Sequence, residues 1–421
     1  MGTDGRRFAV VGSGVSGLVA AHALSRHSQV TLYERDRRLG GHAHTHNVDV
    51  GIGRTVSVDS GFIVHNERTY PVLSRLFGEL GVETRETEMS MSIRDDSRGV
   101  EFAGGRGIRG LFPTARHAAD LQHVRLLAEV PRFHRAARRH LYSTTDEETT
   151  LDGFVRRERF SDRLLYGFLR PLVAAVWSCP PDEVGSYPAR YLFRFLDNHG
   201  MLSVGGSPRW RTVIGGSVRY VERIAAGVAD VRTGVAVRRL SRGDGGVRVT
   251  DGAGRVDAFD GAVVAVHPHQ ALALLDRPTD AERAVLGAIG YTPNPGLLHT
   301  DTSLLPRHEN ACGAWNYLAS GIDGRAAVTY DLTRLMGLPS AGRRVLVTLG
   351  GAGLVAADSI IAELDYEHPA FTTRSVSAVG RLGELNTPAI AFAGAYHGWG
   401  FHEDGAASGL RAAAHLRGSG S

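Results

Sequence analysis

Glycines and one carboxylate near the start of the chain are spaced for holding a dinucleotide. Gly12, Gly14 and Gly17 form a G-x-G-x-x-G pattern directly after the apolar run 8–11. This spacing permits a tight turn, a close approach of backbone N–H groups to a pyrophosphate, and a helix packed against the strand. Glu34 closes the next apolar run and would accept hydrogen bonds from an adenosine ribose. Because the chain has 53 glycines, the alternative is a glycine turn that binds no ligand.

Three alternating histidines follow this segment. His42, His44 and His46 would share one side of a strand and could imitate a metal site. They come directly after the pair Gly40 and Gly41, so packing beside a bound cofactor is the favoured interpretation. We expect no metal in this protein, because the sequence has no H-E-x-x-H motif and no paired C-x-x-C motif.

The densest group of reactive and aromatic side chains lies at residues 396–402. Trp399, between two glycines, could wall one face of a planar ligand, and His402 could transfer a proton. His65 is a further candidate for acid–base or orienting work. The alternatives are ordinary aromatic packing for Trp399 and a structural, hydrogen-bonded role for His402.

The chain contains no lysine, so all 48 of its basic residues are arginine. Genome composition is the preferred explanation, but the chemical consequence stands. The protein can form no lysine Schiff base and has no lysine general base, and every fixed cation is a guanidinium.

The elements that must position these residues follow from hydrophobic periodicity. Buried strands are expected at residues 8–11, 30–33, 261–266 and 389–394, with a helix from about residue 405 to residue 416. Further strands are expected at residues 56–62, 235–237, 297–300, 326–330 and 345–349, and a hairpin pair at 247–249 and 256–259. Residues 70–200 are predicted to be mainly helical, and a helix follows residue 217.

Composition indicates a soluble protein of more than one domain. The hydrophobic fraction is 43% and the charged fraction 22%, and no apolar stretch approaches the roughly 20 residues that span a bilayer. Cys179 and Cys312 make no disulfide framework, and the first strand begins too early for a signal peptide, so we expect a cytoplasmic location. Arginines between residues 106 and 139 could form a basic face for anionic lipid, or simply a solvated helix face; nothing indicates nucleic-acid binding.

These features together resemble the flavin amine oxidase and phytoene desaturase superfamily. The similarity lies in the G-x-G-x-x-G block, in residues 34–45 with their R-x-G-G core, in Val237 with the 263–265 strand, and in Gly394 followed by residues 402–413. The resemblance implies a Rossmann-like, discontinuous FAD-binding domain over residues 1–75, 205–270 and 376–421. An inserted α+β substrate domain would comprise residues 76–204 and 271–375.

A narrower similarity links the chain to predicted FAD-binding proteins associated with cyclopropane-fatty-acid-synthase-type methyltransferases. It is carried by residues 41–45, 59–66, 195–202, 298–302 and 398–405. It implies a lipid-acyl context, with a methyltransferase or a membrane surface as candidate partners.

The resemblance also implies FAD as the cofactor and a set of residues that hold it. These are Gly12, Ser13, Gly14, Ser16, Gly17, Glu34, Arg35, Arg38, Gly40, Gly41, His42, Thr45, Gly61, Phe62, Ile63, Val237, Gly394, Glu403, Asp404 and Gly405.

The predicted function is that of an FAD-dependent oxidoreductase that desaturates or dehydrogenates a long apolar substrate, fatty-acyl or polyene-like. The apolar stretches 164–177 and 191–196 suit a channel for such a molecule. Hydride would pass to the flavin, and His402, His65 or water would take the second proton. The alternatives are a redox-neutral C=C isomerase, an amine oxidase, and a non-catalytic flavoprotein partner of a lipid methyltransferase. Many amine oxidases of the superfamily use a lysine beside the flavin, which this chain cannot do.

Overall fold

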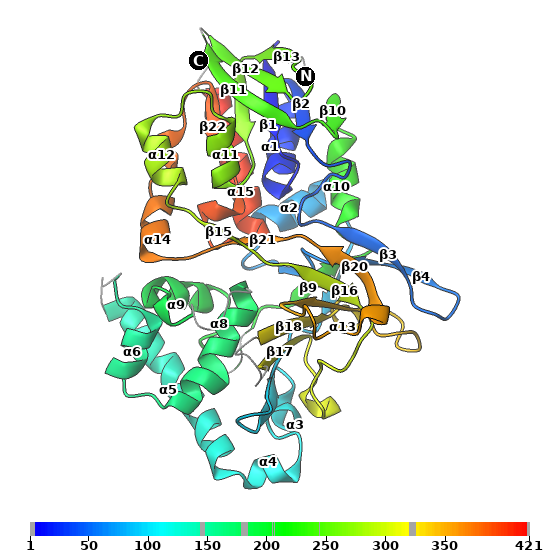
Figure 1. Cartoon of the computed structure of the whole chain (residues 1–421), viewed down its shortest axis with the longest axis vertical. Helices are drawn as coiled ribbons and strands as arrows, with labels where there is room; N and C mark the ends of the chain where they lie inside the picture. The colour runs from blue at the N-terminus through cyan, green and yellow to red at the C-terminus, as the bar shows by residue number, and fades with distance from the viewer. Residues whose placement is uncertain are drawn as a thin grey trace.

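A computed structural model describes residues 5–143, 148–177, 184–203, 205, 207–243, 245–319 and 326–418. Its upper part in Figure 1 surrounds a parallel sheet, and its lower part sets a second sheet beside a group of helices. Cys179 lies outside the described residues, and Cys312 is a buried free thiol. None of the described helices combines the length and apolar character that crossing a bilayer requires. The predicted domain boundaries stay a prediction.

The upper part is built on a parallel sheet in the order β10-β2-β1-β14-β22. Val10 pairs with Val263, which pairs with Ala391, and all three side chains are fully buried. Such continuous apolar runs suit a parallel sheet covered on both faces. The strands are β1 (Arg7–Val11), β2 (Gln29–Glu34), β10 (Asp230–Thr233), β14 (Gly261–Val264) and β22 (Ile390–Phe392). The predicted buried strands and the α/β Rossmann-like class are confirmed.

Helices cover one face of this sheet, and a small antiparallel sheet with further helices covers the other (Figure 1). The first set comprises α1 (Val15–Ser25), α2 (Pro71–Leu80), α10 (Val218–Ala225) and α15 (His402–Gly418). The second comprises β11 (Val237–Gly243), β12 (Gly246–Asp251), β13 (Val256–Phe259), α11 (Pro268–Leu274), α12 (Asp280–Leu286) and α14 (Thr373–Val379).

Helices α1 and α15 approach each other at backbone distance. A Cβ built on Gly409 would lie 2.2 Å from the carbonyl oxygen of Ser16, and one on Gly405 would lie 2.6 Å from Val15 Cγ1. The prediction placed the start of α15 at about residue 405, whereas the helix begins at His402. The Asp404 carboxylate accepts the backbone N–H groups of Trp399 and Phe401, which secures the added first turn.

The lower part contains a mixed sheet in the order β20-β16-β19-β18-β17-β7-β8. Its strands are β7 (Met91–Asp95), β8 (Val100–Gly104), β16 (Gly296–His299), β17 (Trp315–Ala319), β18 (Ala326–Asp331), β19 (Leu346–Leu349) and β20 (Ile360–Leu364). The prediction that residues 70–200 are mainly helical is wrong for β7, β8 and β6 (Thr84–Thr87). The strand β7 is fixed by parallel pairing with β17, a contact more than 200 residues away that local periodicity cannot show.

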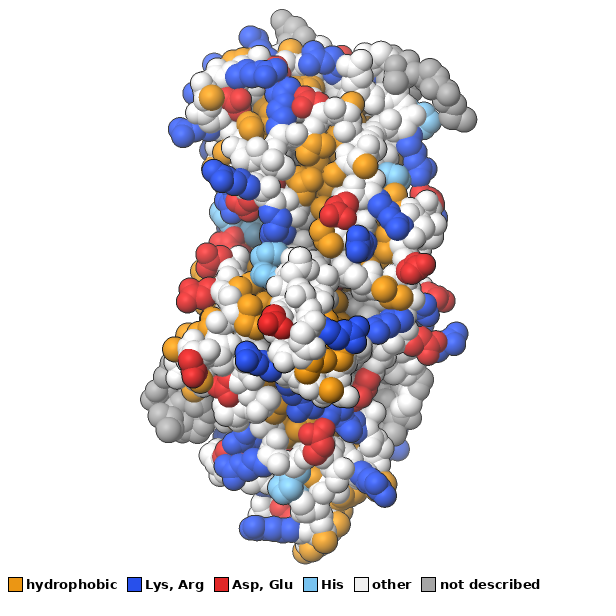
Figure 2. All heavy atoms as spheres, turned by 90° about the vertical axis from the view of Figure 1, so that its right-hand side faces the viewer, with side chains coloured by type: hydrophobic (Ala, Val, Ile, Leu, Met, Phe, Trp, Pro, Cys, Tyr) orange, Lys and Arg blue, Asp and Glu red, His pale blue; other side chains and the backbone are white. Residues whose placement is uncertain are grey.

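The helices beside this sheet supply the larger hydrophobic core of the lower part. They are α3 (Gly107–Leu111), α4 (Ala115–Ala119), α5 (Leu121–Ser143), α6 (Leu151–Arg157), α7 (Asp162–Leu164), a π-helical turn (Leu165–Leu169), α8 (Arg170–Trp177) and α9 (Ala189–Asn198). Several arginines of the predicted basic stretch have acidic partners, as in Arg138 with Asp197 and Arg139 with Glu158. On the face drawn in Figure 2, basic and acidic side chains are likewise interspersed.

Two short pairings join the parts. β15 (Tyr291–Pro293) and β21 (Glu367–Pro369) run antiparallel across the middle of Figure 1. The hairpin of β3 (Thr45–Asp49) and β4 (Thr55–Asp59) is fastened to α10, because Asp59 accepts from the backbone and hydroxyl of Ser217 and from the Thr45 hydroxyl. The remaining strands, β5 (His65–Asn66) and β9 (Trp210–Val213), form a sheet with β6.

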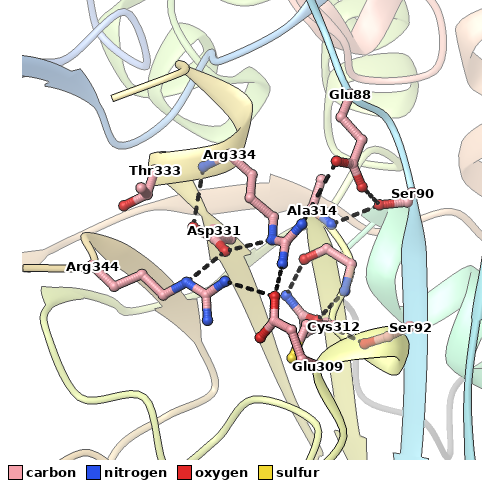
Figure 3. Close-up of polar contacts among 12 residues, drawn as sticks. Glu88, Ser90, Ser92, Glu309, Cys312, Ala314, Asp331, Thr333, Arg334 and Arg344 are labelled. Atoms are coloured by element: carbon pink, nitrogen blue, oxygen red, sulfur yellow. Dashed lines mark hydrogen bonds and ion pairs between the residues drawn. The ribbon is translucent and has the colours of Figure 1, made fainter. Parts of the chain in front are cut away.

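A buried carboxylate organises the lower sheet where β18 passes into α13 (Leu332–Leu335). Asp331 is fully buried and lies 3.0 Å from Arg344 Nε and 3.2 Å from Arg334 Nε, and it accepts the backbone N–H of Arg334 (Figure 3). Burial raises the pKa of Asp331, and the two guanidinium groups oppose that rise. Glu309 pairs with both arginines from the opposite side.

Replacing Asp331 by alanine should reduce the free energy of unfolding by about 3–5 kcal/mol, because two partly buried guanidinium groups would lose the buried one of the two carboxylates they share. Urea unfolding followed by circular dichroism measures this. Glu222→Ala is the control, since Glu222 is 63% exposed and lies 4.0 Å from Arg219. That change should cost less than about 0.5 kcal/mol. Equal effects of the two variants would contradict the role assigned to Asp331.

Candidate functional site

The carboxyl ends of β1 and β2 form the first half of a nucleotide cradle. Gly12 has φ of +97°, and a Cβ there would lie 2.5 Å from the carbonyl oxygen of Ala265. Glu34 Oε2 accepts from the backbone N–H and the hydroxyl of Ser13 at 2.9 and 2.6 Å. Gly14 sits at the start of α1 with nothing within 4 Å of a built Cβ. The glycine loop is therefore fastened to the end of β2 and is open above Gly14.

The second half of the cradle is the turn at residues 38–43. Gly40 pairs with Gly14, and a Cβ built on Gly41 would lie 3.2 Å from the Gly14 Cα. The Arg38 guanidinium donates to the carbonyl groups of Leu39, Gly41 and Ala43 at 2.8–3.1 Å. In this structure Arg38 shapes the loop.

A histidine, a phenylalanine and a tyrosine close the inner end of the cradle. Phe62 stacks on His402 with ring centroids 3.9 Å apart, and the Tyr220 hydroxyl lies 3.1 Å from His402 Nε2. Burial lowers the pKa of His402 to about 3. Gly61 must lack a side chain here, because a Cβ would lie 2.3 Å from the carbonyl oxygen of His42.

The two acidic residues at the start of α15 hold other backbone segments. Glu403 accepts the N–H groups of Val72 and Leu73 at 2.8 and 3.1 Å and so caps the first turn of α2. Asp404 accepts the N–H groups of Trp399 and Phe401 at 3.0 and 2.9 Å. Their predicted cofactor contacts stay predictions; the structure shows each carboxylate fixing a segment next to the cradle.

The residues present fit FAD. Glycines stand where the backbone of the cradle comes closest, the Glu34 carboxylate retains acceptor capacity at the end of β2, and the helix α1 starts without a side-chain cap. The buried Nε2 of His42, the residue after Gly41, has no hydrogen-bond partner among the described residues. A buried polar group without a partner is costly, so a ligand with polar edges suits this place.

The other predicted cofactor residues have the following places. Ser16 and Gly17 lie in the first turn of α1, Arg35 is exposed at the end of β2, and Val237 opens β11. The Thr45 hydroxyl accepts the Val218 N–H and donates to Asp59. Ile63 is buried, its carbonyl accepting from Thr212; Gly394 donates to Ser408, and Gly405 packs on α1.

An aromatic wall faces the loop at residues 398–401. It comprises Trp177, Tyr191, Phe195 and Phe371 with Trp399 and Phe401 packed against them. The Trp177 indole donates to the Trp399 carbonyl at 3.1 Å, and the Tyr191 hydroxyl donates to the Gly398 carbonyl at 2.9 Å. Phe195 stacks on Phe401 with centroids 5.1 Å apart. The polar tips of Trp177 and Tyr191 are thus bound to backbone, so the surface that these two side chains have left is apolar.

A second group of rings lies beside the strand pair β15 and β21 that joins the two parts. His42 stacks on Tyr366 with centroids 4.5 Å apart, and His368 lies 5.5 Å from His42. His368 Nδ1 accepts from the side-chain amide of Asn294 at 2.7 Å. Burial lowers the pKa of His42 well below its ordinary value, and that of His368 to about 4. Tyr366, His368 and Asn294 belong to no sequence motif and were therefore not among the predicted site residues.

The remaining predicted histidines separate in space. The rings of His44 and His46 have centroids 3.9 Å apart and are tilted by 37°, and His46 is bonded to the Ser60 hydroxyl, so packing and hydrogen bonding account for them. His65 is buried behind Phe62 and Phe77, with Nδ1 unpartnered among the described residues and its pKa lowered by burial to about 4. The predicted catalytic roles of His402, Trp399 and His65 stay predictions.

Comparison with known proteins identifies relatives of this arrangement. A family profile described as flavin containing amine oxidoreductase matches residues 15–316. A protein of Mycobacterium tuberculosis named as a flavin-containing monoamine oxidase, AofH, is 28% identical over 288 residues, which cover 65% of this chain. The match spans 60% of the length of that relative.

Solved structures share the fold over nearly the whole chain. Putrescine oxidase bound to putrescine has a TM-score of 0.71 at 17% identity, covering 99% of this chain and 100% of its own. A fatty acid isomerase from P. acnes that produces CLA has a TM-score of 0.70 at 16% identity, covering 96% and 97%. At such identities the likeness concerns the fold alone.

Gly14→Ala should leave the fold intact but weaken FAD binding at least about tenfold, or 1.4 kcal/mol. Gly14 has φ of −60°, and its Cβ would meet nothing within 4 Å, so only a ligand close to the backbone would feel the methyl group. FAD titration of the apoprotein, followed by flavin fluorescence, measures the effect.

Gly17→Ala is the matched contrast, since its Cβ would lie 1.9 Å from the Gly12 carbonyl oxygen. This variant should lose both stability and FAD. Unchanged FAD affinity in Gly14→Ala would show that no ligand approaches the backbone there.

The free energy of unfolding should fall as pH rises from about 4 to about 6, because of Asp404. Burial raises its pKa from 3.8 to about 6, so within this window the folded state binds a proton that the unfolded state has lost. The expected loss is on the order of 2–3 kcal/mol. Urea unfolding at a series of pH values, at constant FAD concentration, measures it.

In Asp404→Asn the side-chain carbonyl can still accept both backbone N–H groups, so the variant should lose the share of this pH dependence that Asp404 contributes and exceed the wild type in stability at pH 7. Burial also raises the pKa of Asp59 to about 6, so a shallower slope should remain. Asp404→Ala should be weaker throughout the range. A wild-type pH slope that persists in Asp404→Asn would assign the effect to another group.

Proposed function

Because the chain belongs to the family of flavin-containing amine oxidoreductases, we propose that it is an FAD-dependent dehydrogenase or desaturase of a long apolar substrate, fatty-acyl or polyene-like. Membership of the family makes the protein an FAD-dependent oxidoreductase. The substrate, and whether the substrate is oxidised or only isomerised, are the proposed parts.

The aromatic wall carries the proposal. The polar atoms of Trp177 and Tyr191 donate hydrogen bonds to the carbonyl groups of residues 399 and 398, respectively. The rest of each ring presents apolar surface to the loop. Trp399 and Phe401 are only partly buried, so they are the members of the wall that a substrate can reach. Apolar surface of this kind binds hydrocarbon through burial, at about 25 cal/mol per Å².

The site offers fewer suitable contacts for an amine substrate. An ammonium group needs an anionic or strongly polar partner when it leaves water. Asp404 is the carboxylate that reaches residues 398–401 in the described structure, and its oxygen already accepts from Trp399 and Phe401. The chain also has no lysine that could hold a water beside a flavin. Both points count against amine oxidation.

FAD, when bound, supplies the acceptor for a hydride removed from a substrate C–H bond. Desaturation also releases a proton. Neutral His402 is held by the Tyr220 hydroxyl, and the lowered pKa values of His402 and His65 make both weak bases at neutral pH. In this proposal the two histidines orient and pack the inner end of the site, and water takes the proton.

The weak bases favour one second candidate, a redox-neutral C=C isomerase. Such a reaction returns the hydride to the substrate and has no net proton to dispose of, so it does not need a strong base. The fold neighbour named as a fatty acid isomerase is in keeping with this variant, although the likeness is one of fold.

An anaerobic titration of the FAD-loaded protein separates these functions. Unsaturated fatty acyl lipids should bleach the flavin absorbance near the visible maximum, whereas putrescine should leave it oxidised. Product analysis by gas chromatography then distinguishes an added double bond from a shifted one. Bleaching by amines alone would establish an amine oxidase, and a flavin unchanged by either class while no lipid is converted would favour a non-catalytic partner.

Variants of Trp399 test whether the wall binds the substrate. Trp399→Ala should raise the half-saturating lipid concentration about tenfold or more, since a buried aromatic side chain contributes about 1.5–3 kcal/mol. Trp399→Phe should have a smaller effect because it keeps an apolar ring. FAD content should be unchanged in both, and an unaltered lipid dependence in Trp399→Ala would remove the wall from the substrate site.

A further inference from the structure

Three side chains that belong to neither the cradle nor the aromatic wall converge where β14, α11 and β21 meet. His267 precedes α11, His269 lies in its first turn, and Glu367 opens β21. His267 Nδ1 is 2.8 Å and His269 Nε2 is 3.9 Å from Glu367 Oε2. One nitrogen or oxygen of each residue lies within 4.8 Å of the others, a spacing that could hold a metal ion.

The two histidines are held in place by their surroundings. Pro268 between them occupies the first helical position, where its ring fixes φ near −65°. Gln270 accepts the backbone N–H of His267, and the His267 ring stacks on Tyr291 with centroids 4.0 Å apart. The imidazole that contacts Glu367 is therefore positioned before any ion arrives, which reduces the entropic cost of binding.

The sequence has no metal-binding motif and predicts no metal, but the fold brings together ligands that are about 100 residues apart in the chain. Against that expectation, we propose that His267, His269 and Glu367 bind one divalent transition-metal ion of the zinc class. Two imidazoles and one carboxylate are the ligand types that Zn²⁺ prefers, and three protein ligands leave a position for water. The imidazole of His267 would turn its Nδ1 lone pair to the ion, and the Glu367 oxygen that now contacts Nδ1 would become a neighbouring ligand. Oxygen-preferring ions such as Mg²⁺ suit this set less well.

The local charges permit such binding. Metal ligation requires unprotonated imidazole, and burial, with a smaller contribution from Arg35, lowers the pKa of His267. Glu367 opposes this shift and supplies the negative charge. Arg35 repels a cation, but its side chain is 68% exposed, so solvent screens it. His269 is 53% exposed, which gives an ion a route to the cluster.

A bound ion would fasten the parallel sheet to the strand pair that joins the two parts. The residue after Glu367 is His368, which faces His42, and the next is Pro369, against which a Cβ built on Gly400 would lie at 2.8 Å. The ion would thus stabilise the segment that lies between the ring group at His42 and the loop of Trp399. The site does not depend on which substrate the enzyme uses.

Isothermal titration of tag-free, FAD-loaded protein with ZnCl₂ tests the proposal. We expect one ion per chain, with binding weakened at least about 10–100-fold in His269→Ala and in Glu367→Gln, since even outer-shell partners have effects of that size. His308→Ala is the matched control. His308 also forms an imidazole–carboxylate pair, with its Nδ1 2.7 Å from Glu101 Oε1, but it is not part of the cluster. This variant should bind Zn²⁺ like the wild type.

Thermal unfolding gives a second measurement. Zn²⁺ should raise the melting temperature of the wild type and of His308→Ala, and EDTA should reverse the rise; neither should affect His269→Ala. Absence of Zn²⁺ binding would overturn the proposal. Binding that persists unchanged in both cluster variants would overturn it as well. The neighbouring pair His44 and His46 would then be the next candidate ligands.

Discussion

The structure depends on the close approach of α1 to α15. Gly409 and Gly405 bring the last helix to backbone distance from Ser16 and Val15, and Gly17 brings α1 equally close to the Gly12 turn. These contacts place the starts of both helices beside the carboxyl ends of β1, β14 and β22. Residues separated by nearly 400 positions therefore lie side by side. Any side chain larger than hydrogen at Gly405 or Gly409 would push α15 away from α1.

A second constraint is that the buried histidines of the site stay uncharged. His42, His368 and His402 have pKa values lowered by burial, and the carboxylates nearest to the loop at residues 398–401 accept backbone N–H groups. Ionised groups in such surroundings would cost free energy unless each were paired. The carboxylates and the Trp177 and Tyr191 tips of this region thus hold backbone segments, and the surface beside them is that of aromatic rings.

Sequence reasoning succeeded where the chemistry lies in consecutive residues. The turn at Gly12 and Gly14, the carboxylate of Glu34 and the apolar parallel strands all follow from local pattern. It failed where the partner is distant: β7 is a strand because β17 pairs with it, and Glu403 caps α2 across more than 300 residues. Tyr366, His368 and Asn294 could not be found at all, because single polar residues on short strands carry no periodic or motif information.

The strand pair β15 and β21 joins the part of the molecule around the parallel sheet to the part around the mixed sheet. Its few residues carry Tyr291 and Glu367 toward α11 on one side and His368 toward His42 on the other. A short ladder of backbone hydrogen bonds is weak by itself, since an isolated pair of strands is marginally stable in water. The ring contacts of Tyr291 and His368 and the hydrogen bond between His267 and Glu367 add stabilisation on its two sides.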